Sequence, residues 1–206
     1  MCIRDRSVHI NPTPVELKTP IPFADDREHA SYNPESVHRF WRILVHADQI
    51  FRQFSSGFVG KISPVHFFWG SFDLAVTRFS GRPAPAREGA DPITREAYSH
   101  EVISAGFWPG NGGFGEAAFY CYAAPSPAGL KAEPIEPSAA KYNTALGEYI
   151  FKYDDLRAQP SPDEALLTFL QSSYDAASKL AKWDRALLDR QRGSSVGFQQ
   201  SRQIRE

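Results

Sequence analysis

Apolar residues recur along the chain at two different periods, which separate the helices from the strands. From Pro34 to about residue 55, large apolar side chains return every three or four positions, the period of one helix face. Asn33 precedes this stretch as a good N-cap, and proline suits the first helical position. The pattern predicts a long amphipathic helix over residues 34–55. Its apolar stripe is Val37, Phe40, Trp41, Leu44, Ala47, Phe51 and Phe54.

A second helix is predicted to begin at Pro162. Ser161 and Glu164 have the spacing of a capping box, in which each side chain accepts a backbone N–H of the first helical turn. The positions that follow again repeat at helical spacing. The inward-facing set is Leu166, Phe169, Leu170, Tyr174, Ala177 and Leu180.

Residues 63–82 form the most concentrated aromatic stretch of the chain, and we predict that they form a β-hairpin. A single strand over this stretch would be far longer than the usual five or six residues. Gly70 and Ser71 provide a two-residue turn, because glycine at its first position is typical of a type II′ hairpin. With that turn, Phe67 lies opposite Leu74.

The same hairpin places two ionisable side chains together. His66 and Asp73 fall on one face as diagonal cross-strand neighbours, whereas an unbroken strand would put them on opposite faces. Ionisable groups within such an apolar run need a partner or a function, because burying them alone is costly.

Three further apolar runs, at residues 98–108, 118–123 and 148–153, predict strands, and proline- and glycine-rich segments such as 81–94 predict loops. Helix, several strands and helix in this order predict an α+β fold. We expect an antiparallel sheet of about five strands with two main helices packed on one face.

The chain length of 206 residues suits one domain with a sizeable core. We expect that domain to span residues 8–192. Residues 1–7 begin with MCIRDR, which looks like a translated sequencing adapter, and residues 193–206 form a polar tail that we expect to fray.

Charge and composition exclude several partner classes. The 23 basic and 24 acidic residues give a net charge of −1, which argues against a nucleic-acid partner. Neither a secretory signal nor a run of about 20 apolar residues is present, so we expect a soluble cytoplasmic protein with no membrane partner. The cysteines are Cys2 and Cys121, and the apolar surroundings of Cys121 predict a buried, reduced thiol.

Four strings carry a specific resemblance to a known family: HASYNPESVHRFW, SPVHFFWGSFDLAVTRFSGR, YSHEVISAGFWPG and FYCYAAP. Together they resemble a bacterial family known only as a domain of unknown function, number 5996, over roughly residues 16–190. The resemblance implies no activity, cofactor or catalytic residue. Members look longer at the N-terminal side, so the resemblance implies that this chain is the C-terminal portion of a broken gene.

Candidate chemistry centres on His66 and Asp73 of the hairpin and on His100 and Glu101 of the next strand. Two histidines and a carboxylate are the minimum for an open metal site, and the same groups could serve acid–base catalysis. The spacing lacks a metal-binding motif, so we assign no metal ligand. A structural interpretation pairs Asp73 with an arginine.

The sequence does not determine a function. A small-molecule pocket is one candidate, with a metal-dependent or acid–base enzyme and a structural or partner-binding module as alternatives. The aromatic, histidine and arginine residues of this region would line such a pocket for a flat or anionic molecule, with arginine as the anion-binding group. The candidate ligand-binding residues are Trp69, Arg78, Arg82, Tyr98 and Trp108. Cofactors and oligomeric state are not indicated by any motif.

Overall fold

The computed structural model describes residues 11–14, 19–68, 70–110 and 114–190. The chain divides into two units, Met1–Val45 and His46–Glu206, and helix α1 (Pro34–Ser56) contains the boundary between them. In the first unit the Asn33 side chain accepts the backbone N–H of Ser36 at 2.8 Å, which confirms the predicted cap. The adapter-like start and the tail at 193–206 lie outside the described residues, and the single domain at 8–192 stays a prediction.

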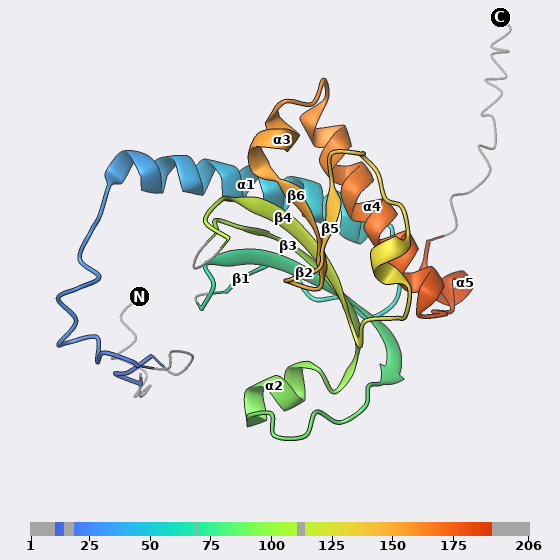
Figure 1. Cartoon of the computed structure of the whole chain (residues 1–206), viewed down its shortest axis with the longest axis horizontal. Coiled ribbons are helices and arrows are strands. Elements are labelled where there is room, and N and C mark those ends of the chain that lie inside the picture. Colours follow the sequence, from blue (N-terminus) through green and yellow to red (C-terminus); the bar gives the residue numbers. More distant parts are fainter. Residues whose placement is uncertain (1–10, 15–18, 69, 111–113, 191–206) are drawn as a thin grey trace, which may run out of the picture. The chain divides into compact units, whose positions relative to one another are not determined.

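One antiparallel sheet forms the centre of the second unit, in the strand order β1-β2-β3-β4-β6-β5 (Figure 1). The described residues thus form six strands, one more than expected, because the three-residue β5 at the sheet edge is too short to show a pattern in the sequence. The strands are β1 (His66–Phe68), β2 (Asp73–Pro83), β3 (His100–Trp108), β4 (Ala118–Ala124), β5 (Lys141–Asn143) and β6 (Glu148–Lys152).

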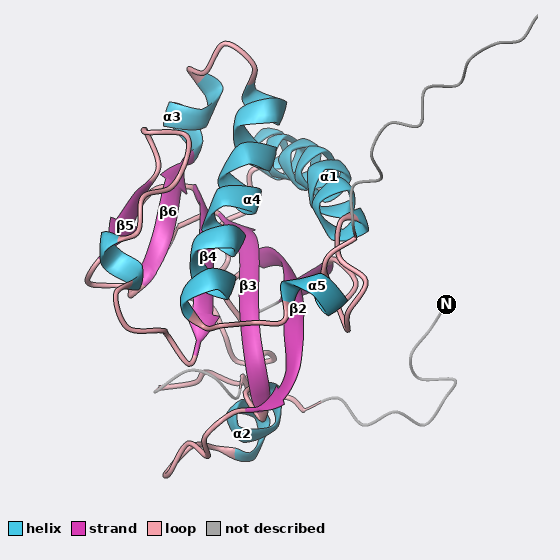
Figure 2. Ribbon diagram, turned by 90° about the vertical axis from the view of Figure 1, so that its right-hand side faces the viewer, coloured by secondary structure: helices cyan, strands magenta, loops and turns pink. Residues whose placement is uncertain are grey.

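Helices complete an α+β fold. Figure 2 shows α4 (Pro162–Leu180) running along one face of the sheet, where it contacts β3 and β4. The shorter helices are α2 (Pro92–Ala97), α3 (Tyr153–Arg157), α5 (Arg185–Leu188) and the 3₁₀ turn η2 (Leu130–Ala132). None of the helices among the described residues combines the length and apolar composition needed to cross a membrane.

The hairpin of β1 and β2 has the predicted register and a different turn. Phe67 pairs with Leu74, and the last pair before the turn is Phe68 with Asp73. The described turn residues 70–72 include Phe72, so the turn is not confined to the two residues that we predicted. Phe72 has a φ of 58°, the left-handed conformation that allows a longer hairpin loop to close.

The Ser161 side-chain cap predicted at the start of α4 is not formed. The helix begins at Pro162 as predicted, but the Ser161 side chain makes no capping hydrogen bond. Its backbone ψ of 84° differs from the extended conformation that usually directs a cap side chain toward the first turn. The predicted side-chain cap is wrong, and the proline at the first position marks the helix start without it.

The hydrophobic core lies between the sheet and the helices of the second unit. Phe119 packs edge-on against Phe51 of α1 at 6.2 Å between ring centroids, and Phe151 packs against Phe169 of α4 at 5.6 Å. Cys121 is a free, fully buried thiol on this face, as expected, and burial raises its pKa to about 12. Aromatic contacts therefore form much of the link between sheet and helices.

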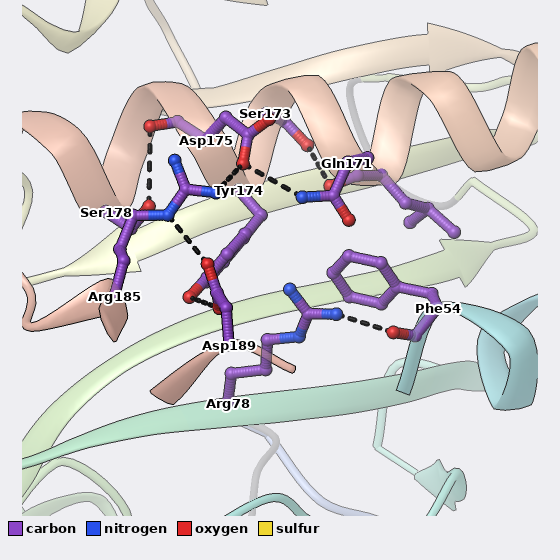
Figure 3. Close-up of polar contacts among 10 residues, drawn as sticks. Phe54, Arg78, Gln171, Ser173, Tyr174, Asp175, Ser178, Arg185 and Asp189 are labelled. Atoms are coloured by element: carbon purple, nitrogen blue, oxygen red, sulfur yellow. Dashed lines mark hydrogen bonds and ion pairs between the residues drawn. The ribbon is translucent and has the colours of Figure 1, made fainter. Parts of the chain in front are cut away.

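Arg78 is a buried cation within this core and only 1% exposed (Figure 3). Its guanidinium carbon lies 3.5 Å from the ring centroid of Phe54 and 4.2 Å from that of Tyr174. One guanidinium nitrogen donates to the Phe54 carbonyl at 2.5 Å, whereas Nε has no hydrogen-bond partner among the described residues. Burial lowers the pKa of Arg78 to about 10, so the side chain remains charged at neutral pH.

Tyr174 connects this cation to a surface network that Figure 3 also shows. Its hydroxyl donates to Asp189 at 2.6 Å, and Arg185 bridges Asp189 and Asp175 at 2.8 and 2.6 Å. The two rings nearest Arg78 thus belong to α1 and α4, and Tyr174 connects them to Asp189 after α5. We interpret Arg78 as a structural residue.

We expect Arg78→Lys to lower the free energy of unfolding by roughly 2–4 kcal/mol, because an ammonium group cannot lie flat between two rings or keep the planar hydrogen-bond geometry. The urea midpoint at unchanged m-value measures this loss. The control is Arg157→Lys at a side chain that is 65% exposed. Equal midpoints for the two variants would contradict a structural role for Arg78.

Candidate functional site

The candidate site lies on the sheet face opposite α4. Strand alternation directs Leu74, Phe107 and Phe119 into the core, so Asp73, Trp108 and Tyr120 point to the other face. This face contains a cavity of about 260 Å³. Its described lining residues are Ser71, Asp73, Trp108, Tyr120, Tyr122, Leu146 and Glu148.

A glycine on the middle strand allows the key contact of this cavity to form. Gly106 of β3 lies between Ala75 of β2 and Tyr120 of β4, and an added Cβ would come within 2.5 Å of the Tyr120 ring and hydroxyl. Without a side chain at Gly106, the Tyr120 ring crosses β3 and its hydroxyl donates to Asp73 at 2.5 Å. Two strands separated by about 10 Å are thereby joined across a third.

The Tyr120 phenol remains protonated in this position. Burial, followed by the nearby Asp73 carboxylate, raises its pKa far above the ordinary tyrosine value. The phenol therefore keeps its proton and remains a hydrogen-bond donor to Asp73.

Glu148 is the second carboxylate of the cavity, at the start of β6. Burial and then the charge of Asp73 raise the pKa of Glu148 to about 7. Its carboxylate receives no hydrogen bond from any of the described residues. The site therefore combines one carboxylate that accepts a tyrosine hydrogen bond and one that changes charge near neutral pH.

Aromatic rings form the walls around the two carboxylates. Trp108 stacks on Phe114 at 5.4 Å, and its buried indole Nε1 has no hydrogen-bond partner within the described part of the chain. Tyr122 stacks on Tyr120 at 6.1 Å, and its hydroxyl lies 3.0 Å from that of Tyr98. These rings provide apolar surface beside a small set of polar groups, the usual composition of a ligand pocket.

The four residues proposed for metal or acid–base chemistry do not come together. His66 and Asp73 share one face of the hairpin, as the register predicts, but only Asp73 lines the cavity. His100 begins β3, whose other end carries Trp108 beside the cavity, so eight residues of strand, or about 26 Å, separate them. No group of three or more His, Cys, Asp or Glu suited to a metal occurs among the described residues.

Glu101 has a structural environment of its own. It accepts two hydrogen bonds from Arg82, whose guanidinium also donates to the backbone carbonyls of Ala181 and Lys182 after α4. Glu101 also lines a second cavity of about 160 Å³ together with Trp183. The Arg82–Glu101 pair thus joins the end of β2 and the start of β3 to the backbone that follows α4.

The proposed ligand-binding residues fall into different environments. Trp108 lines the cavity, and Tyr98 supports it through Tyr122 and lies beneath the Arg87 guanidinium at 3.9 Å. Arg78 is in the core on the opposite face, and Arg82 binds Glu101, so neither supplies the arginine expected for an anion. Trp69 lies outside the described residues.

Sequence reasoning missed Gly106, Tyr120, Tyr122 and Glu148. The alternation in FYCYA was a usable signal, because it places both tyrosines on the face opposite Phe119 and Cys121. The approach of Glu148 to Asp73 depends on pairing between strands far apart in sequence, which no local pattern indicates.

Comparison with known proteins gives a family and no activity. The sequence model of a family of unknown function, DUF5996, matches residues 4–190. No curated protein and no solved structure matches the chain significantly.

We expect Gly106→Ala to destabilise the chain by about 1–3 kcal/mol, because the new methyl group would collide with Tyr120 and with the Leu74 carbonyl. Thermal or urea unfolding measures the loss. Gly57→Ala is the matched control, since a Cβ there meets only the Phe54 carbonyl, at 3.6 Å. If the two variants are equally stable, the crossing of Tyr120 over β3 is wrong.

A second prediction concerns pH. Between about pH 4.5 and 7 the folded chain holds a proton on Glu148 that the unfolded chain has released, so this residue makes stability fall as pH rises through that window. We expect the ionisation of Glu148 to lower the free energy of unfolding by roughly 1–2 kcal/mol, after allowance for the partial exposure of this residue.

Urea unfolding of wild type and Glu148→Gln at pH 4.5, 6 and 8 isolates this contribution. The variant should gain stability relative to wild type as the pH rises. A difference between the two proteins that stays constant with pH would show that Glu148 has an ordinary pKa.

Proposed function

The chain belongs to the DUF5996 family, whose function is unknown, and we propose that it binds a small organic molecule in the cavity between Asp73, Trp108 and Glu148. The observation that carries this proposal is the convergence of two carboxylates and three large aromatic side chains on one cavity of the sheet. Its volume of about 260 Å³ lies just below the usual range of ligand pockets, which favours a small ligand.

Two features of the cavity support binding over a purely structural role. The indole N–H of Trp108, which has no hydrogen-bond partner among the described residues, is a donor that a bound acceptor would satisfy, because buried polar groups are rarely left without partners. Glu148 has a raised pKa and therefore lowers stability when ionised, and residues that reduce stability are frequent in functional sites.

Fragment screening by ¹H–¹⁵N NMR on the full chain tests the proposal. Compounds that bind should shift the Trp108 indole signal and the backbone amide signals of Tyr120 and Tyr122. Trp108→Ala should weaken these compounds at least about tenfold, since it removes an aromatic wall. The matched control is Trp41→Ala, at a tryptophan that is 61% exposed and does not line the cavity. The proposal fails if no compound shifts these signals, or if Trp108→Ala binds the same compounds equally well.

Acid–base catalysis by the same two carboxylates is a second candidate function. Two carboxyl groups in different environments can serve as base and acid, here Asp73, which accepts the Tyr120 hydrogen bond, as base and Glu148, whose pKa is raised to about 7, as acid. NMR spectra of bound fragments in heavy water, followed over time, would reveal solvent exchange at a ligand carbon. Exchange that is lost in both Asp73→Asn and Glu148→Gln would support catalysis, and its absence for every ligand would argue against it.

The other expectations for this protein come from the sequence alone. A bacterial origin, a cytoplasmic location and a longer full-length protein stay predictions, as does the alternative of a structural or partner-binding module. The small-molecule interpretation is the one that uses the cavity directly.

A further inference from the structure

Charge, aromatic walls and protonation in the cavity point to one ligand class. We infer that the molecule bound between Asp73 and Glu148 is an organic cation such as a primary or quaternary ammonium compound. This inference rests on the proposed function and narrows it to a class of ligand.

The charge of the cavity is the first argument. Two of its described lining residues are carboxylates, and none is Lys, Arg or His. Of the basic side chains on this face of the sheet, Lys152 binds Glu116 at 2.7 Å, and Lys141 of β5 is not one of the described lining residues. A bound cation would be attracted by both carboxylates that line the cavity.

The walls provide the second argument. Trp108, Tyr120 and Tyr122 present aromatic surface beside the carboxylates, and the electron-rich face of such rings attracts alkylammonium groups. An organic cation would use both the oxygen atoms and the rings, whereas a hydrated metal ion would use the oxygen atoms alone. The apolar side chain of Leu146 completes a surface suited to the carbon skeleton of the ligand.

Protonation of Glu148 makes binding dependent on pH. The titratable groups on the same face of the sheet are Asp73 of β2, Tyr120 and Tyr122 of β4, and Lys141 of β5. Lys141 lies two residues along β5 from Asn143, the strand partner of Glu148. Of these titratable groups, Asp73 is the charged group that raises the pKa of Glu148. A cation binds best to ionised Glu148, so affinity should rise as pH increases through 7.

Three probes of almost the same shape separate the effects of charge and of shape: benzylamine, benzyl alcohol and benzoate. Calorimetric titration of the full chain at pH 8 should give benzylamine an affinity about tenfold or more above that of benzyl alcohol, with no binding of benzoate. At pH 6 benzylamine should bind up to about tenfold more weakly, because Glu148 is then roughly nine-tenths protonated.

Variants assign these effects to residues. Glu148→Gln should abolish the pH dependence, and Asp73→Asn should weaken benzylamine at both pH values. The control is Asp154→Asn, which removes a carboxylate that is 87% exposed and outside the cavity, and it should leave binding unchanged. The comparison of the three probes in wild type needs no variant, so it stands even if Asp73→Asn folds poorly.

The outcomes separate the inference from the proposed function. The inference of a cationic ligand is overturned if benzyl alcohol or benzoate binds as tightly as benzylamine, or if benzylamine binds more tightly at pH 6 than at pH 8. Either result would leave the proposal of a small-molecule pocket intact. Binding of neutral fragments in the cavity without any binding of benzylamine would also overturn the cationic ligand and leave the small-molecule pocket. If none of the three probes binds and no fragment shifts the Trp108 signal, the proposed function fails as well.

Discussion

The hydrogen bond from Tyr120 to Asp73 is the constraint on which the polar face of this protein depends. It joins β4 to β2 across β3, and it exists only because Gly106 leaves room for the ring between them. The same bond fixes Asp73 as an acceptor and directs its charge toward Glu148, whose pKa rises in response to burial and to that charge. One missing side chain on the middle strand thus determines both the geometry and the electrostatics of the cavity.

The two faces of the sheet have separate roles. One face is filled by aromatic packing against α4 and the second half of α1, with the enclosed cation Arg78 as its polar exception. The other face carries two carboxylates, two tyrosines and a tryptophan around a cavity. Sequence reasoning expected arginine and anion recognition at the site, whereas the structure assigns Arg78 to the core and Arg82 to an ion pair with Glu101. The charge of the cavity is therefore the opposite of the one expected.

Local patterns predicted the parts of the fold that local physics determines. The hairpin register of Phe67 with Leu74 followed from alternation, and α1 followed from its apolar stripe and the Asn33 cap. Helix α2 was missed inside a predicted loop, although Asp91 caps it through the N–H groups of Ile93 and Thr94 and proline follows directly. A helical repeat of apolar positions over only six residues is too short to be recognised among the surrounding glycine and proline residues. The meeting of Asp73 with Tyr120 and Glu148 was beyond local patterns, because pairing among β2, β3, β4 and β6 creates it.

The coupling between Glu148 and Asp73 is the central claim, and a carbon-detected NMR titration of the Glu148 carboxyl group tests it most directly. The account predicts a titration midpoint near pH 7 in wild type. In Asp73→Asn the midpoint should be lower, while burial keeps it above the usual glutamate value of 4.5. A wild-type midpoint near 4.5, or one that Asp73→Asn leaves unchanged, would show that the two carboxylates do not share a buried site.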